Sequence, residues 1–157
     1  MKIKMLYVGK TTDKAVILGM EKYLKRMKKY VSFSQDMVPG LKNTKNLSEK
    51  EIKQKEGKMI LDKLSPHDFL ILLDENGKEF NSVAFASLIE KKMLHATRSI
   101  VFLIGGAYGF SDDVYNKAQQ KIALSQMTFS HQIIRLIFME QIYRAFTIIN
   151  KEPYHHE

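Results

Sequence analysis

The sequence contains no cysteine and only three prolines among its 157 residues. The lack of cysteine excludes a disulfide scaffold, thiolate catalysis and any zinc or iron–sulfur site built on cysteine, and it suits a reducing compartment. No apolar run approaches the roughly 18 residues that a membrane-spanning helix needs. The N-terminal apolar stretch is short, carries Lys4 within it and lacks the apolar core of a signal peptide. We therefore expect a cytoplasmic protein with no membrane partner.

Two nucleotide-binding motifs and the common metal motif are also missing. Gly9, Lys10 and Thr11 could end a P-loop, but Lys4 stands where that motif requires a glycine. Gly9 stands alone, so the dinucleotide-binding fingerprint fails as well. The sequence has no HExxH motif, and its five histidines are scattered apart from a terminal pair. We therefore expect no metal ion.

The composition is that of a globular and basic chain. Apolar residues make up 45% of it, and 157 residues are enough for one domain, residues 1–157, with a hydrophobic core. Lysine and arginine number 25 against 17 aspartates and glutamates, which gives a net charge of +8. This charge favours a polyanionic partner, of which RNA is the usual candidate.

Hydrophobic patterning predicts strands and helices in alternation. Continuous or alternating apolar runs predict strands, periodic ones predict helices, and Asn-Gly between charged residues predicts a turn at residues 75–78. The predicted strands are 3–8, 32–38, 69–73, 100–104 and 122–124, and the predicted helices are 13–31, 48–64, one from 82, one from 111, and 133–149. This order is typical of an α/β fold with a mostly parallel sheet and helices on both faces.

Two of the predicted strands end in irregular loops. Gly105 and Gly106 follow the strand at 100–104, and residues 125–131 follow the short strand at 122–124. In open α/β sheets, ligands bind at the carboxyl ends of the strands. We therefore expect these two loops to lie side by side and to form the functional site.

Basic residues gather on one side of the helix predicted at 13–31. Lys22, Lys25, Arg26 and Lys29 share a face, with Lys28 nearby. Such a stripe can contact RNA phosphates, or it can be an ordinary solvated helix face. The sequence leaves both interpretations open.

The last helix, 133–149, is apolar in nearly every direction around its axis. A helix of this kind must be buried on all sides. One sheet face of a 157-residue chain does not provide that cover, so we expect a two-fold homodimer. Glu140 and Arg144 lie one turn apart on this helix and are expected to form an ion pair.

Four motifs occur in a characteristic order: LIGG-xx-G, LSQMTF-x-H, R-x4-EQIYRAF and a final PYHHE. With them the whole chain resembles the ribosomal RNA large subunit methyltransferase H family of the SPOUT superfamily. The resemblance implies an α/β fold with a C-terminal trefoil knot, S-adenosyl-L-methionine as cofactor, and a homodimer. It also implies methylation of N3 of a pseudouridine in a stem-loop of 23S ribosomal RNA, within the assembled ribosome.

The resemblance also assigns site residues. The cofactor-binding residues are expected to be Leu73, Gly105, Leu124, Ser125, Gln126, Met127, Thr128 and Phe129. The imide nitrogen of the target must lose its proton, so a base or polarising group is required. His155, Tyr154 and Arg144 are the catalytic candidates that the resemblance favours, His131 is another, and the C-terminal tail is expected to order over the site.

One departure from the family pattern precedes His131. Members of the family commonly have a proline where this chain has Ser130. A serine hydroxyl can accept a hydrogen bond from the first-turn amides of a helix. We therefore expect Ser130 to begin the last helix.

Two other functions remain open. The chain could be a methyltransferase of the same fold that acts on transfer RNA, which is distinguished by the purified RNA that accepts a labelled methyl group. It could also be a non-catalytic protein that binds RNA or the ribosome. Calorimetry with S-adenosylmethionine separates that case, because a pure binding module has no reason to bind the cofactor.

Overall fold

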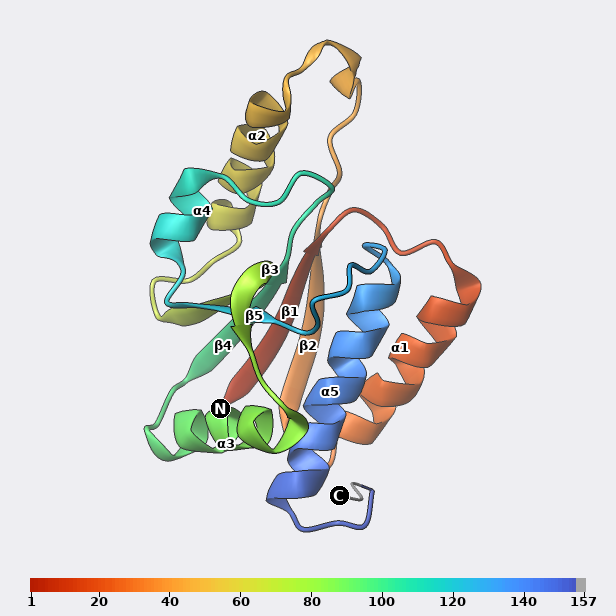
Figure 1. Ribbon diagram of the computed structural model, residues 1–157, viewed down its shortest axis with the longest axis vertical. Helices are drawn as coiled ribbons and strands as arrows, with labels where there is room; N and C mark the ends of the chain where they lie inside the picture. Colours follow the sequence, from red (N-terminus) through yellow and green to blue (C-terminus); the bar gives the residue numbers. More distant parts are fainter. Residues whose placement is uncertain (155–157) are drawn as a thin grey trace.

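A computed structural model describes residues 1–154, so His155 lies outside the described residues. Strands and helices alternate along the chain as the sequence predicts (Figure 1). The strands are β1 (Lys2–Val8), β2 (Ser32–Val38), β3 (Asp68–Glu79), β4 (Ser99–Ile104) and β5 (Gln120–Ala123). The helices are α1 (Lys14–Met27), the 3-10 turn η1 (Thr44–Asn46), α2 (Glu49–Asp62), α3 (Ser82–Leu94), α4 (Asp112–Lys117) and α5 (Ile133–Ile149).

The five strands form one sheet in the order β2-β1-β4-β3-β5, and every pair is parallel. This confirms the predicted parallel sheet. All strands therefore end at the same edge, where the loops after them gather. The loops after β4 and β5 are not immediate neighbours, because β3 lies between the two strands and contributes its own end to that edge.

Helices cover both faces of the sheet, as predicted. Alternate residues of β4 point to opposite sides, which is the geometry of any strand. Phe102 packs in the core with α1, α3 and α5, whereas Leu103 packs in the core with α2 and α4. Both side chains are fully buried, so the continuous apolar run at 100–104 reflects burial on two faces.

Two predicted helix starts carry the expected side-chain caps. Ser48 and Glu51 form a capping box at α2, in which the backbone amide of Ser48 donates to Glu51 Oε2 at 2.7 Å. Ser111 Oγ accepts from the amide of Val114 at the start of α4. α5 differs, because its N-cap residue is Gln132 and that residue makes no side-chain capping bond. Ser130, which replaces the family's proline, lies two residues earlier, and its Oγ accepts from the amide of Ile133 at 3.2 Å.

The predicted helix 13–31 is too long. α1 ends at Met27, and the amides of Tyr30 and Val31 turn back to the carbonyl of Met27. The chain leaves the helix here because β2 begins at Ser32 and needs extended backbone.

The turn predicted at residues 75–78 is wrong, because β3 continues to Glu79. Its register against β5 shifts between Leu73 and Lys78, so the intervening residues form a bulge inside the strand. The amide of Asn76 donates to Asp74 Oδ1 at 2.8 Å, which is the local chemistry of a turn. A Cβ at Gly77 would lie 2.5 Å from the carbonyl carbon of Ile122, so only glycine lets β3 pass β5 this closely.

No helix within residues 1–154 is long and apolar enough to cross a membrane.

Candidate cofactor site and catalytic residues

A cavity of about 810 Å³ lies at the carboxyl ends of β4 and β5 and beside the bulge within β3. Its walls come from residues 73–76, residues 104–110 and most of residues 123–131, with Glu49 of α2 and Tyr115 of α4 at its sides. The volume falls in the range typical of small-molecule and cofactor sites, about 300–1,000 Å³. The loops that the sequence assigns to the functional site therefore do line one cavity.

Seven of the eight expected cofactor-binding residues line this cavity. They are Leu73, Gly105, Leu124, Ser125, Met127, Thr128 and Phe129. Gln126 is exposed and does not line the cavity. His131, one of the catalytic candidates, lies in the same wall.

The glycine loop after β4 closes tightly against the protein behind it. A Cβ at Gly105 would lie 2.9 Å from the ring of Phe110, which is buried. The amide of Gly109 donates to the carbonyl of Gly106 and closes the loop. Gly105 therefore offers backbone, and no side chain, to a bound molecule.

Exposed apolar side chains also line the cavity, in the loop after β5. The side chains of Met127 and Phe129 are 77% and 40% exposed although both line the cavity. Ser125 Oγ accepts from the amide of Met127 at 2.9 Å and fixes the turn between them. Large apolar surface held open at a cavity wall is available to a ligand.

Sequence reasoning missed a tyrosine–aspartate pair at the bulge within β3. The hydroxyl of Tyr115 donates to Asp74 Oδ2 at 2.5 Å, and Oδ1 of the same carboxylate accepts from the amide of Asn76. Burial and the neighbouring carboxylate raise the pKa of Tyr115, so it stays a protonated donor. An acidic residue directly after the predicted strand 69–73 was the signal that could have pointed to it.

The charged side chains that line the cavity are acidic. They are Glu49, Asp74 and Glu75, and neither lysine nor arginine belongs to the described lining. The chain as a whole carries a net charge of +8. The cavity thus presents negative charge within a positive molecule, which favours a cationic ligand.

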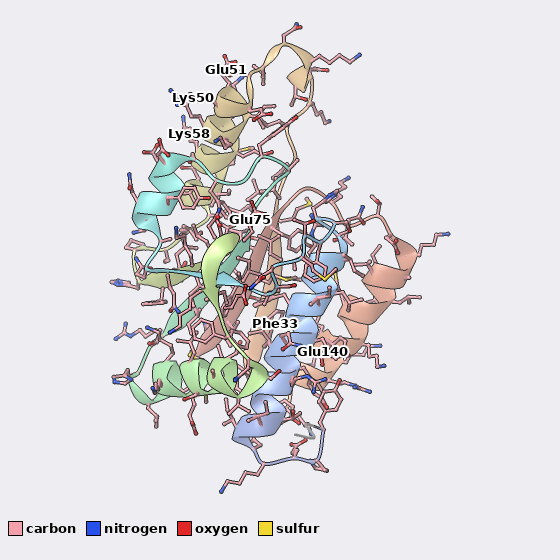
Figure 2. The ribbon with its side chains drawn as sticks, in the orientation of Figure 1. Phe33, Lys50, Glu51, Lys58, Glu75 and Glu140 are labelled. Atoms are coloured by element: carbon pink, nitrogen blue, oxygen red, sulfur yellow. The ribbon has the colours of Figure 1, made fainter. Side chains whose placement is uncertain are left out.

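Arg144 and Tyr154 lie away from this cavity. Arg144 pairs with Glu140 at 2.8 Å, which confirms the predicted ion pair, and the hydroxyl of Tyr154 donates to Glu140 at 3.3 Å. Figure 2 shows Glu140 on α5 and, higher in the view, Glu75 at the bulge of β3. Within one chain the structure therefore does not bring these two catalytic candidates to His131, and His155 lies outside the described residues.

Within residues 1–154, no group of three or more histidine, cysteine, aspartate or glutamate side chains could hold a metal ion.

Comparison with known proteins identifies the family. Residues 1–155 match the family model described as "Predicted SPOUT methyltransferase". The chain is 55% identical over 157 residues to a Phocaeicola vulgatus protein named ribosomal RNA large subunit methyltransferase H, and all of both chains is covered. Relatives of the same name from Flavobacterium psychrophilum and Bacteroides fragilis are 54% and 51% identical, again with complete coverage. The chain belongs to the ribosomal RNA large subunit methyltransferase H family of SPOUT methyltransferases.

A solved structure has the same fold at low sequence similarity. It is described as a probable methylase family protein from Haemophilus influenzae Rd KW20, with a TM-score of 0.52 and 12% identity. The similarity covers 99% of this chain and 70% of the other. The α/β SPOUT methylase fold is therefore shared; the trefoil knot implied by the sequence resemblance stays a prediction.

A SPOUT methyltransferase needs a methyl donor, and the cavity fits one with a sulfonium centre. Its volume suits a nucleoside, its apolar wall at Met127 and Phe129 suits an adenine face, and Gly105 allows backbone to approach. The carboxylates of Asp74 and Glu75 complement a positive sulfur.

Proposed function

We propose that this chain is an S-adenosylmethionine-dependent methyltransferase that modifies N3 of a pseudouridine in 23S ribosomal RNA within the assembled ribosome. We propose further that residues 1–157 act as one domain, in the cytoplasm, as a homodimer. The observation that supports this most strongly is the cavity at the strand ends, which gathers seven of the eight expected cofactor residues. The relatives named for large-subunit RNA methylation support the RNA substrate.

The cofactor would supply an electrophilic methyl group. The backbone of Gly105 and of residues 124–129 would bind its adenosine part, with Leu73 and Met127 against the base. Asp74 would accept hydrogen bonds from its hydroxyl or amino groups, since each carboxylate oxygen retains an acceptor site beyond the bond it already makes. These residues position the donor and need no covalent step of their own.

N3 of the target must lose its proton before it can accept the methyl group. His131 lies in the cavity wall, where its imidazole can accept that proton. Arg144 and Tyr154, and His155 beyond the described residues, would act from a second copy of the chain. This arrangement accounts for catalytic candidates that lie away from the cavity of their own chain.

α5 supports the homodimer. In one chain it packs on the sheet between α1 and α3, and eight of its residues are buried. Ile133, Ile137 and Ile148 are only half-buried. A second copy against this helix would cover these side chains and would place its own Tyr154 near the neighbouring cavity.

The experiment incubates the purified protein with labelled S-adenosylmethionine and, separately, with ribosomes, free 23S RNA and transfer RNA. We expect label in 23S RNA of ribosomes, and mass spectrometry is expected to place it on a pseudouridine. Label in transfer RNA alone would support the alternative of a transfer RNA methyltransferase. No label together with no calorimetric binding of the cofactor would leave a non-catalytic binding protein.

A further inference from the structure

Residues 39–58 project beyond the carboxyl ends of β1 and β2 (Figure 1). They comprise the loop after β2, the short η1 turn and the first part of α2, and we call them the lysine arm. Its lysines are Lys42, Lys45, Lys50, Lys53, Lys55 and Lys58. Its carboxylates are Glu49, Glu51 and Glu56, and Glu56 is buried. The exposed surface of the arm is therefore strongly positive.

The lysines of the arm are not used by the fold. Lys53 is half-buried and the other five are exposed. Within residues 1–154 the structure gives none of the six side chains a hydrogen bond or an ion pair, and the one electrostatic partner among them is Glu51, whose pKa is lowered in small part by Lys55. Figure 2 shows Lys50 and Lys58 on α2, beside the arm's capping residue Glu51.

The basic stripe on α1 is different, because part of it serves the fold. Lys29 forms an ion pair with Glu152 at 3.3 Å. The guanidinium of Arg26 lies 5.5 Å from the ring centre of Tyr143 on α5. Lys22, Lys25 and Lys28 of the stripe form no ion pair among the described residues, as the lysines of the arm do not, so the two surfaces differ in only part of their charge and in their distance from the cavity.

The arm also lies at the cavity. Glu49, the first residue of α2, is part of the cavity lining. The capping box of Ser48 and Glu51 fixes this end of the helix, and Ile52 and Ile60 are buried beneath it. Lysines on this helix are therefore held on an ordered support beside the site.

The charges of the arm and the cavity are opposite. The cavity lining is acidic, so it repels phosphate and admits a base or a cationic donor. The arm beside it attracts phosphate. A nucleotide could thus enter the cavity base-first while its backbone stays outside, as in enzymes that act on an extruded base.

We propose that the lysine arm binds the phosphate backbone of the RNA that flanks the target nucleotide. This rests on the proposed function, since it takes RNA as the substrate. Lys50 and Lys58 are eight residues apart on one helix, about 12 Å along its axis. That distance is greater than the separation of neighbouring phosphates in a nucleic-acid strand, so lysines on the helix can contact more than one phosphate.

The test compares two variants that each lose four positive charges. In the arm variant, Lys42, Lys45, Lys50 and Lys58 are changed to glutamine; in the control, Lys14, Lys22, Lys25 and Lys28 of the α1 region are changed in the same way. All eight lysines are exposed, and glutamine has nearly the same helix propensity as lysine. Binding to unmethylated ribosomes is measured over a range of salt concentrations, with cofactor binding by calorimetry and thermal unfolding alongside.

We expect the arm variant to bind ribosomes at least tenfold more weakly near 0.1 M salt. Its plot of log affinity against log salt should be shallower by about 3, because each lost phosphate contact removes about 0.7–0.9. Cofactor binding and the unfolding midpoint should match those of the unaltered chain. The control should lose much less ribosome affinity.

Three outcomes would overturn the proposal. The arm variant could bind ribosomes as well as the unaltered chain, the control could lose equal or greater affinity, or the unaltered chain could fail to bind ribosomes at all. Failure of the proposed function is separate, because it appears as an absence of methyl transfer by the unaltered chain in the presence of cofactor. If the unaltered chain binds ribosomes through the arm but does not methylate them, the inference about the arm stands and the proposed methyltransferase activity is wrong.

Discussion

The hydroxyl of Tyr115 donates to the carboxylate of Asp74 at 2.5 Å, and both residues line the cavity. The bond fixes the orientation of the Asp74 carboxylate, which we propose accepts hydrogen bonds from the cofactor. In Tyr115→Phe the ring stays and the donor is lost, so Asp74 should reorient and solvate. We expect the dissociation constant for S-adenosylmethionine, measured by calorimetry, to rise several-fold, as befits one charge-assisted hydrogen bond.

Tyr108→Phe is the matched control for this change. Tyr108 lines the same cavity, and within residues 1–154 the structure gives its hydroxyl no hydrogen-bond partner. This variant should bind the cofactor as the unaltered chain does. Equal losses in the two variants would show that the Tyr115–Asp74 bond is not what positions the carboxylate.

Gly77→Ala should destabilise the protein by about 2 kcal/mol or more. The new Cβ would lie 2.5–2.7 Å from the backbone of Ile122, so β5 must move. Gly40→Ala is the control, since the nearest atom to its Cβ would be 3.8 Å away. Urea denaturation of both variants measures the difference, and a Gly77→Ala protein as stable as Gly40→Ala would show that β3 and β5 do not cross so closely.

The pattern of elements and the location of the site could be predicted from the sequence because each rests on local signals. Strands buried on both faces have continuous apolar sequences, and the helix caps at Ser48 and Ser111 follow from short-range chemistry. The carboxyl edge of a parallel sheet collects its loops whatever the strand order is. The cavity could therefore be expected without knowing that β3 separates β4 from β5.

The remaining features depend on contacts that are distant in sequence. The pair Asn76 and Gly77 is typical both of a turn that leaves a sheet and of a bulge within a strand. Pairing with β5 makes it a bulge here, and β5 is some 45 residues away in the sequence. Arg144 likewise lies along α5, away from the cavity, although Arg144 and the cavity-lining residues belong to motifs of the same family. The order of motifs predicts which residues are functional, but it does not predict which of them are in contact within one chain.

Deleting residues 153–157 should abolish methyl transfer and leave cofactor binding largely intact. The deletion removes Tyr154 and His155, and of the removed residues that the structure describes, Pro153 and Tyr154, neither lines the cavity of its own chain. Methylation of ribosomes and calorimetric binding of the cofactor are measured on the same preparation. A truncated protein with normal activity would remove the tail from the mechanism.

Arg135 ties α5 to the loop after β1, and it is completely buried. Its guanidinium donates to the carbonyl of Val8 at 2.7 Å and to the hydroxyl of Thr11 at 2.6 Å, and it lies 4.2 Å from the ring centre of Tyr7. Burial lowers the pKa of Arg135, and its Nε has no hydrogen-bond partner. Burying this charge therefore has a free-energy cost that the two bonds offset.

Arg135→Ala should destabilise the protein by about 3–5 kcal/mol, because it leaves a cavity and removes both bonds. Arg135→Met keeps most of the volume and removes the buried charge, so its cost should be smaller by at least about 1 kcal/mol. Chemical denaturation compares the two. Equal costs would mean that the hydrogen bonds to the loop, and not the filled volume, account for the contribution of Arg135.

Glu56 provides a pH-dependent test of burial. It lies in α2 behind the glycine loop, only 8% of it is exposed, and a Cβ at Gly106 would meet its carboxylate at 2.6 Å. Burial raises the pKa of Glu56. The folded state therefore binds this proton more tightly than the unfolded state, and the free energy of unfolding falls as pH rises from the ordinary range of glutamate through the raised value.

Glu56→Gln removes this titration. Relative to the unaltered chain, the variant should gain stability as pH is raised from about 4 to 7.5, a range that begins near the ordinary glutamate pKa. Glu51→Gln on the same helix is the control of opposite sign, because hydrogen bonds from Ser48 lower the pKa of Glu51. That variant should lose stability relative to the unaltered chain over the same interval, since the stability that comes from the lowered pKa of Glu51 is complete only above the ordinary glutamate pKa. Denaturation curves at both pH values measure the two slopes, and a Glu56→Gln difference that stays constant with pH would show that the Glu56 carboxyl is solvated in the folded protein.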